Sequence, residues 1–176
     1  HRVDQVAPPP VNGKEISDAF FTLAAAAVND VATVMEDIAG KIAVESLLEP
    51  FTLSLIEYFR SLPHDSVQKS KLVFNKVSQQ MKHYAEEYDV LLSPVTGIPT
   101  PPPGYLSPLL DRETIIERTH KLAGFTPLRN ITGMPAMSFP LFKLEGNIPC
   151  GSHFAARPGQ DALLLSLAYQ LEETLR

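Results

Sequence analysis

One pair of residues in this sequence has the types and spacing that activate a serine nucleophile. Ser66 and Lys69 stand in a Ser-x-x-Lys arrangement, in which a lysine one helical turn away can take the proton of the serine. The pair falls at the exposed start of an amphipathic helical pattern, and the companion Lys-Thr-Gly and Ser-Asp-Asn motifs are absent from the 176 residues. We therefore do not assign it a catalytic role.

Cys150 and His153 form a second pair, a thiol and a base that can make a strong nucleophile when they are in contact. Both fall in an apolar run that is typical of a β-strand, where residues three apart point to opposite faces. We therefore expect the two side chains not to meet, and we interpret Cys150 as a small buried residue. Read from the residues alone, the chain has no catalytic constellation of its own.

The histidines and glycines do not indicate a metal or cofactor site. No two histidines have a metal-ligand spacing such as His-x-x-x-His, and the nine glycines form no phosphate-binding cluster. We expect no metal and no cofactor. Asn130-Ile131-Thr132 matches the glycosylation sequon, but we favour a local hydrogen-bonding role for its side chains at a helix or turn end. The five histidines are His1, His64, His83, His120 and His153.

Five helices are predicted to carry the scaffold. The first begins near Gly13, after a possible capping box of Asn12 and Glu15, and ends at Gly40. Its apolar stripe has helical spacing. The stripe consists of Phe20, Leu23, Ala27, Val31, Val34 and Ile38. The other four helices are predicted from Pro50 to Pro63, from Asp65 through a seam that reaches Tyr88, from Asp111 to Leu122 and from Asp161 to Leu175.

Three apolar runs predict strands. Val90–Leu92 is unbroken by polar residues, which favours a strand covered on both faces. Ala136–Leu141 and Ile148–Ala156 are joined across Glu145-Gly146-Asn147 at hairpin spacing. The run from Ile98 to Gly104 is rich in proline and predicts an extended loop, either a spacer or a segment that faces substrate. The pattern indicates an α/β protein with a mixed β-sheet flanked by helices.

Composition excludes some partners. The formal net charge is −5, and no cluster of lysine and arginine suggests nucleic-acid binding. No uninterrupted apolar run approaches the roughly 20 residues that span a bilayer, so no membrane partner is expected. Without a signal peptide and with a single cysteine, we expect a cytoplasmic location. The chain opens at His1 on what reads as a strand before a proline-rich turn, so we expect it to be cut from a longer chain.

Several blocks of the chain resemble the amidase signature hydrolases. Tyr88–Thr96 is similar to the family's Tyr-Asp-x-Leu-x-x-Pro segment. Asn130–Pro140 is similar to its Asn-x-x-Gly-x-Pro-Ala-x-Ser-x-Pro segment, which is the most specific of the blocks. Pro149–Gly151, Arg157–Gly159 and the leucine-rich helix up to Glu172 follow in the family's order.

The resemblance implies that residues 1–176 form the carboxy-terminal part of an amidase signature domain, the second half of an α/β/α sandwich. The family hydrolyses carboxylic amide bonds with a Ser-Ser-Lys mechanism. Its catalytic segment lies upstream of the blocks found here, so no catalytic residue is carried over to this chain. The expected partners are the upstream half of the same protein and a small amide substrate, with a homo-oligomer possible because a sheet edge and an apolar face would lack cover.

What the resemblance implies for this half is a structural role and a share of the walls of the substrate pocket, although each wall residue could serve packing or capping instead. The expected wall residues are Thr96, Ile98, Phe125, Asn130 and Met134. His153 stands where many relatives carry glutamine, a version similar to the branch that acts on nylon-type amides such as the 6-aminohexanoate cyclic dimer. The alternative is a non-catalytic binding or interaction module on an amidase-derived scaffold.

Overall fold

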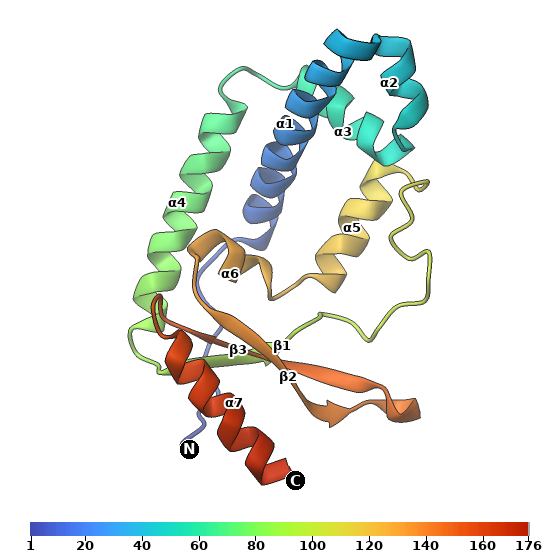
Figure 1. Cartoon of the computed structure of the whole chain (residues 1–176). Coiled ribbons are helices and arrows are strands. Elements are labelled where there is room, and N and C mark those ends of the chain that lie inside the picture. The colour runs from blue at the N-terminus through green and yellow to red at the C-terminus, as the bar shows by residue number, and fades with distance from the viewer. Residues whose placement is uncertain (176) are drawn as a thin grey trace. The chain divides into compact units, whose positions relative to one another are not determined.

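The structure, a computed structural model, describes residues 1–175, which separate into two compact units. The helical unit consists of Lys14–Phe74 and Thr96–Phe125. The sheet unit consists of His1–Gly13, Asn75–Val95 and the chain from Thr126 onward. The boundary between Phe74 and Asn75 falls inside one continuous helix, and Figure 1 labels the elements of both units.

The helical unit is built from helices that the sequence largely predicts. The element that the sequence did not reveal is α2, a short helix directly after Gly40. The helices are α1 (Gly13–Ala39), α2 (Lys41–Leu47), α3 (Pro50–Ser61), the first part of α4 (Ser66–Ala85) and α5 (Arg112–Leu122). The predictions for α1, α3, α4 and α5 are confirmed, since each helix starts or stops near the expected proline, glycine or capping residue.

The apolar stripe that helical spacing picks out on α1 lies mostly on the exposed side of the helix. Most of its large side chains are exposed, Ile38 to 82%, whereas Phe21, Ala25 and Ala32 on the other side of the helix are buried. The exposed members of the stripe are Phe20, Ala27, Val31, Val34 and Ile38. Because α1 carries apolar residues around much of its circumference, periodicity alone could not choose the face, and α3 packs on the side that offers alanines.

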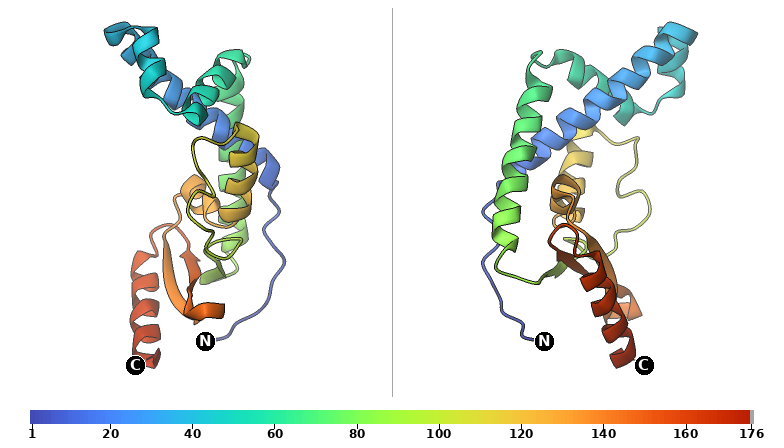
Figure 2. Two further views of the ribbon diagram at one scale, coloured as in Figure 1. Left: turned by 90° about the vertical axis from the view of Figure 1, so that its right-hand side faces the viewer. Right: turned by 60° about the vertical axis from the view of Figure 1, so that its left-hand side comes forward.

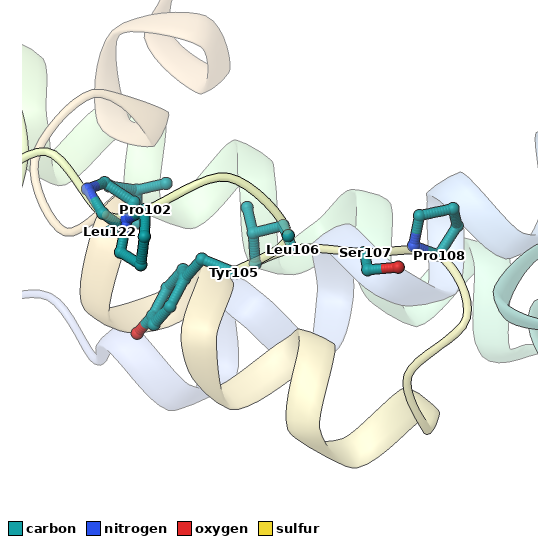
Figure 3. A pocket seen from close by; sticks show the side chains of 8 residues that line it. Pro102, Tyr105, Leu106, Ser107, Pro108 and Leu122 are labelled. Atoms are coloured by element: carbon teal, nitrogen blue, oxygen red, sulfur yellow. The ribbon is translucent and has the colours of Figure 1, made fainter.

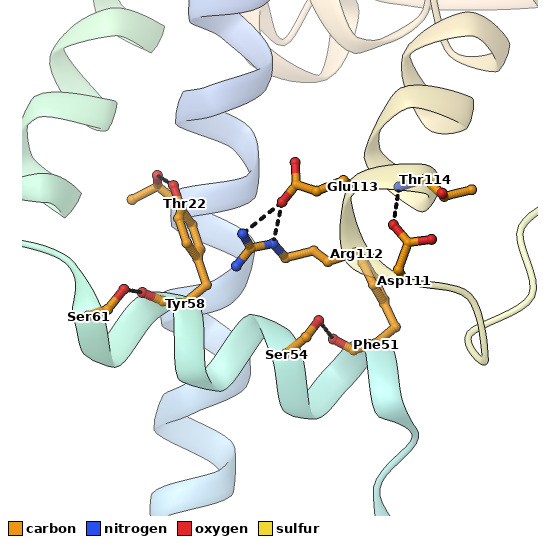
Figure 4. A network of polar contacts seen from close by, with 9 residues as sticks. All are labelled: Thr22, Phe51, Ser54, Tyr58, Ser61, Asp111, Arg112, Glu113 and Thr114. Carbon is orange, nitrogen blue, oxygen red and sulfur yellow. Dashed lines mark hydrogen bonds and ion pairs between the residues drawn. The ribbon is translucent and has the colours of Figure 1, made fainter.

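The core of the helical unit lies between α1 and α3. Phe21, Ala25 and Leu55 are buried together, and the partly buried residues against them are Phe51, Tyr58, Phe59 and Ile116. A cation–π contact between Arg112 of α5 and Tyr58 of α3 extends this packing to α5 (Figure 4). The guanidinium of Arg112 lies 4.6 Å from the centre of the Tyr58 ring.

Asp111 begins α5 as predicted. Its Oδ1 accepts a hydrogen bond of 2.8 Å from the backbone N–H of Thr114, which satisfies one free donor of the first helical turn. The hydrogen bonds from Thr114 hold the pKa of the Asp111 carboxyl below its usual value. The carboxylate therefore stays charged where it stabilises the helix start.

By length and mean hydropathy alone, α1 could cross a membrane. A core helix of a soluble protein and a signal sequence pass the same test, so this finding is weak evidence. The longest mainly apolar stretch of α1, from Ala19 to Val28, lies between Asp18 and Asn29, so it is shorter than the roughly 20 residues that span a bilayer. In the helical unit Arg60 joins α3 to α1 through Glu36 at 3.0 Å and Asn29 at 2.8 Å.

The sheet unit contains a three-stranded sheet in the order β1-β3-β2, with both pairings antiparallel. Its strands are β1 (Val90–Pro94), β2 (Ala136–Lys143) and β3 (Pro149–Ala156). The predicted hairpin is confirmed, and a short 3₁₀ turn over Glu145–Asn147 joins β2 to β3. The same unit also contains two helices, α6 (Pro127–Thr132) before β2 and α7 (Asp161–Leu175) after β3. The predicted α/β class is confirmed, and α7 packs against the sheet.

Helix α7 covers one face of this sheet (Figure 1, Figure 2). Leu164 of α7 is buried with Phe154 and Ala156 of β3. Helix α7 packs mainly on β2 and β3. Leu92, on the edge strand β1, is therefore 53% exposed. The expectation that β1 is covered on both faces is therefore not met within the described residues. The partly buried residues around this core are Val90, Met137, Phe139, Leu141, Leu163, Leu167 and Leu171.

The first residues of the chain form no strand, contrary to the prediction from the sequence. They are held instead by side chains of α4. Tyr84 donates its hydroxyl to the carbonyl of Ala7 at 2.6 Å, and Gln80 donates its amide to the carbonyl of Pro10 at 3.1 Å. Residues 1 to 7 pair with none of the three described strands, so this segment joins no sheet ladder.

Candidate functional site

The loop after β1 is fixed by a close approach of backbone to helix α5. The N–H of Gly97 donates to the carbonyl of Leu122 at 2.9 Å. A Cβ at position 97 would collide with the carbonyl oxygen of Lys121, so only glycine fits here. Next to it, Thr96 donates its hydroxyl to the carbonyl of Ile98 at 2.8 Å. The Thr-Gly pair thus sets the direction in which the proline-rich loop leaves.

A shallow apolar hollow of about 460 Å³ lies along this loop in the helical unit (Figure 3). Arg118 of α5 supports it, donating to the carbonyl of Tyr105 at 2.8 Å with its guanidinium 4.9 Å from the ring centre. The hollow contains none of the five wall residues predicted from the sequence, although Pro101, Pro102 and Gly104 belong to the predicted proline-rich loop. Its lining residues are Pro101, Pro102, Gly104, Tyr105, Leu106, Ser107, Pro108 and Leu122.

The Asn-x-x-Gly block folds as a short helix followed by a tight turn. Thr132 donates its hydroxyl to the carbonyl of Leu128 at 2.7 Å and so closes α6. Gly133 then adopts a left-handed conformation with φ 66°, which a side chain would oppose. The turn leaves Asn130 exposed and buries Met134 to 4% exposure. Asn130 and Met134 thus flank the end of α6 in the sheet unit.

A polar row crosses the sheet on the face opposite α7. Ser93 of β1 and Ser138 of β2 are both in register with His153 of β3, so the three side chains share one face. Ser93 Oγ and His153 Nδ1 are 3.1 Å apart. His153 is only 5% exposed, and burial, followed by the nearby charge of Arg129, lowers its pKa below the ordinary value.

The Ser93–His153 pair is therefore poorly arranged for general-base catalysis. A serine nucleophile needs a histidine whose protonated form is stabilised, usually by a carboxylate. Here the charged neighbour is a cation, which disfavours imidazolium. The bond is better suited to satisfying two polar groups inside the sheet unit.

Arg129 of α6 is the second unusual polar group of the sheet unit. Its Nη1 lies 3.7 Å from the sulfur of Met134, a weak acceptor. Its Nε is buried without a hydrogen-bond partner among the described residues. Burial lowers the pKa of the Arg129 guanidinium, although the group remains charged at neutral pH. Arg129 adjoins Asn130 in the chain, but sequence reasoning passed over it because a single arginine in an apolar block carries no motif.

The two nucleophile pairs considered from the sequence are not assembled. Lys69 is held by Asp65 at 2.7 Å, so its charge faces a carboxylate. Cys150 and His153 alternate on β3 and so lie on opposite faces of the sheet, as expected. Within residues 1–175, no group of three or more histidine, cysteine or acidic side chains could hold a metal.

The five predicted wall residues are divided between the two units. Thr96, Ile98 and Phe125 belong to the helical unit, where Thr96 is exposed, Ile98 is half-buried and Phe125 is 37% exposed. Asn130 and Met134 belong to the sheet unit. Their role as substrate contacts stays a prediction.

Comparisons with known proteins agree on one family. The family described as Amidase matches residues 1–165 of this chain. AmiC of Mycobacterium leprae (strain TN), named as a candidate amidase, is 34% identical over 178 residues, which cover 98% of this chain and 36% of that protein. A fatty acid amide hydrolase of Arabidopsis thaliana is 29% identical over 137 residues, covering 77% of this chain and 22% of that protein.

Solved structures show the same fold. The 6-aminohexanoate cyclic dimer hydrolase in complex with its substrate matches with a TM-score of 0.82 and 21% identity, over 96% of this chain and 37% of that chain. A crystal structure described as an amidase matches with a TM-score of 0.64 and 21% identity, over 90% of this chain and 36% of that chain. The chain thus spans just over a third of the length of AmiC and of the 6-aminohexanoate cyclic dimer hydrolase.

Proposed function

This chain belongs to the amidase family, and from that membership we propose that it is part of an enzyme that hydrolyses carboxylic amide bonds. The family match over residues 1–165 is the observation that carries the proposal. The block from α6 through Gly133 into β2 supports it, because the residues that carry the resemblance are also those that make the turn. We place the enzyme in the cytoplasm.

In this proposal the chain is the carboxy-terminal part of one amidase domain over residues 1–176. The Ser-Ser-Lys groups are supplied by chain upstream of it. This part contributes sheet core through β1, β2 and β3, and it contributes pocket walls. The proposed wall residues are Thr96, Ile98, Phe125, Asn130 and Met134.

The proposed substrate is a small amide. The fold of the 6-aminohexanoate cyclic dimer hydrolase matches 96% of this chain. The resemblance of the sequence further implies that His153 stands where many members of the family carry glutamine. Both features favour nylon-type oligomer amides as the first compounds to test. No cofactor is required for the proposed chemistry, because an activated serine and backbone N–H donors suffice for acyl transfer.

The test compares the full gene product with the purified 176-residue chain. Hydrolysis is measured as the amount of ammonia or amine released from simple amides and from the 6-aminohexanoate cyclic dimer. We expect turnover by the full gene product and none by the 176 residues alone. Turnover by the 176 residues alone would refute the division of roles, and a full product that cleaves no amide would favour a binding module instead.

A further inference from the structure

Arg129 is a partly buried cation without an anionic partner. Several other arginines of the described chain are paired, for example Arg60 with Glu36 at 3.0 Å and Arg112 with Glu113 at 2.7 Å. No described residue forms an ion pair with Arg129. Its Nη1 donates to the Met134 sulfur at 3.7 Å, and its charge lowers the pKa of His153. The buried Nε of Arg129 is therefore a donor that no group in residues 1–175 satisfies.

A guanidinium in this position is costly unless it is paired. Removing a charge from water is unfavourable, and a buried N–H without an acceptor adds a further penalty. The surroundings of Arg129 do not supply the missing charge. His153 is held neutral, and Tyr84 donates its hydroxyl to the carbonyl of Ala7. An anion with two acceptor oxygens would satisfy the group.

A carboxylate matches this requirement in charge and shape. The planar fork of arginine donates two parallel hydrogen bonds to the two oxygens of a carboxylate. Arg129 is half-buried, so it combines a desolvated Nε with a side chain that is still partly accessible. Partial desolvation strengthens a charge-assisted hydrogen bond relative to one at a fully exposed site.

The position of Arg129 connects it to the proposed pocket. It precedes Asn130 on α6 and contacts Met134, and both are proposed wall residues in the same unit. We propose that Arg129 binds a carboxylate group of the substrate and so selects amides that carry a free acid. The inference rests on the proposed function, since it assigns a specificity to the same pocket. The substrate class is the monoamides of dicarboxylic acids and linear oligomer amides that end in a carboxylate.

The experiment compares matched anionic and neutral substrates with the full gene product. The substrates are the monoamides of the four- to eight-carbon dicarboxylic acids and the corresponding diamides, such as adipamate and adipamide. For at least one chain length, we expect wild type to favour the monoamide in kcat/KM about ten-fold or more, as charge-assisted hydrogen bonds do. Arg129→Gln should abolish that preference, with the monoamide losing more in kcat/KM than the diamide and chiefly through KM. Arg129→Lys should keep part of the preference.

Arg157→Gln is the matched control, since Arg157 is an exposed arginine of the same unit. It should leave the preference intact. Wild type that favours no monoamide over its diamide would overturn the inference, whether or not the variants fold. An equal loss of activity on both substrates in Arg129→Gln would also overturn it. That result would mean that Arg129 pairs with an acidic side chain of the protein and not with the substrate.

Binding separates this inference from the proposed function. Calorimetric titration of the full gene product with the same dicarboxylates and diamides needs no turnover. If wild type prefers a dicarboxylate such as adipate and Arg129→Gln removes that preference, the inference is supported even where no amide is cleaved. The lack of cleavage would then count against the proposed function alone. Absence of such binding for every dicarboxylate in the series overturns the role of Arg129 whatever the enzyme hydrolyses.

Discussion

His153 lies in the central strand of the sheet, where its surroundings keep it neutral. Burial is the main cause of its lowered pKa, and the charge of Arg129 adds to it. The unfolded chain, with a histidine pKa of about 6.5, therefore binds a proton at a higher pH than the folded chain does. Folding stability supplied by the neutral histidine is present at neutral pH and is lost as pH falls through about 6.5.

Replacing His153 should flatten this part of the pH profile. In His153→Gln, the free energy of unfolding should change less between about pH 7.5 and pH 5.5 than in wild type, because no group at this position takes up a proton. Urea unfolding at a series of pH values measures the slope. Ser93→Ala is the control, since it removes the 3.1 Å partner and keeps the titrating ring. Equal slopes for His153→Gln and wild type would contradict the explanation.

At Gly97 the backbone of the loop that follows β1 contacts the end of α5. Gly97→Ala would bring a Cβ against the carbonyl oxygen of Lys121, which is backbone and cannot rotate away. We expect a loss of about 1–3 kcal/mol in the free energy of unfolding, as overpacking typically costs. Gly13→Ala, which has open space around its Cβ, should change stability by less than about 0.5 kcal/mol. Similar urea midpoints for the two variants would show that the loop is not held in this way.

The molecule as a whole exposes a stripe of apolar side chains along α1. Contiguous patches of this kind favour association, so the purified 176-residue chain should form oligomers whose mass rises with concentration. Light scattering after gel filtration measures that mass. The double variant Val31→Lys with Val34→Lys should shift the chain toward monomer, whereas Leu72→Lys on α4 should not. A monomer at every concentration would show that the stripe drives no association.

Features that depend on neighbouring residues could be predicted from the sequence. Pro50, Asp111 and the leucine pattern from Asp161 placed three helices because caps and periodicity act within a few residues. The turn at Glu145–Asn147 likewise predicted the hairpin. The block Asn130–Pro140 indicated the family by its residues alone, because it combines several turn residues in a fixed order.

Only the tertiary structure decided which surfaces meet. The choice of Phe21 and Ala25 over Val31 and Ile38 depends on α3, which lies outside the local window of α1. The contact between Gly97 and α5, and the absence of a carboxylate at Arg129 within residues 1–175, also depend on segments distant in sequence. Burial and pairing are properties of neighbours in space, and periodicity records only neighbours in the chain.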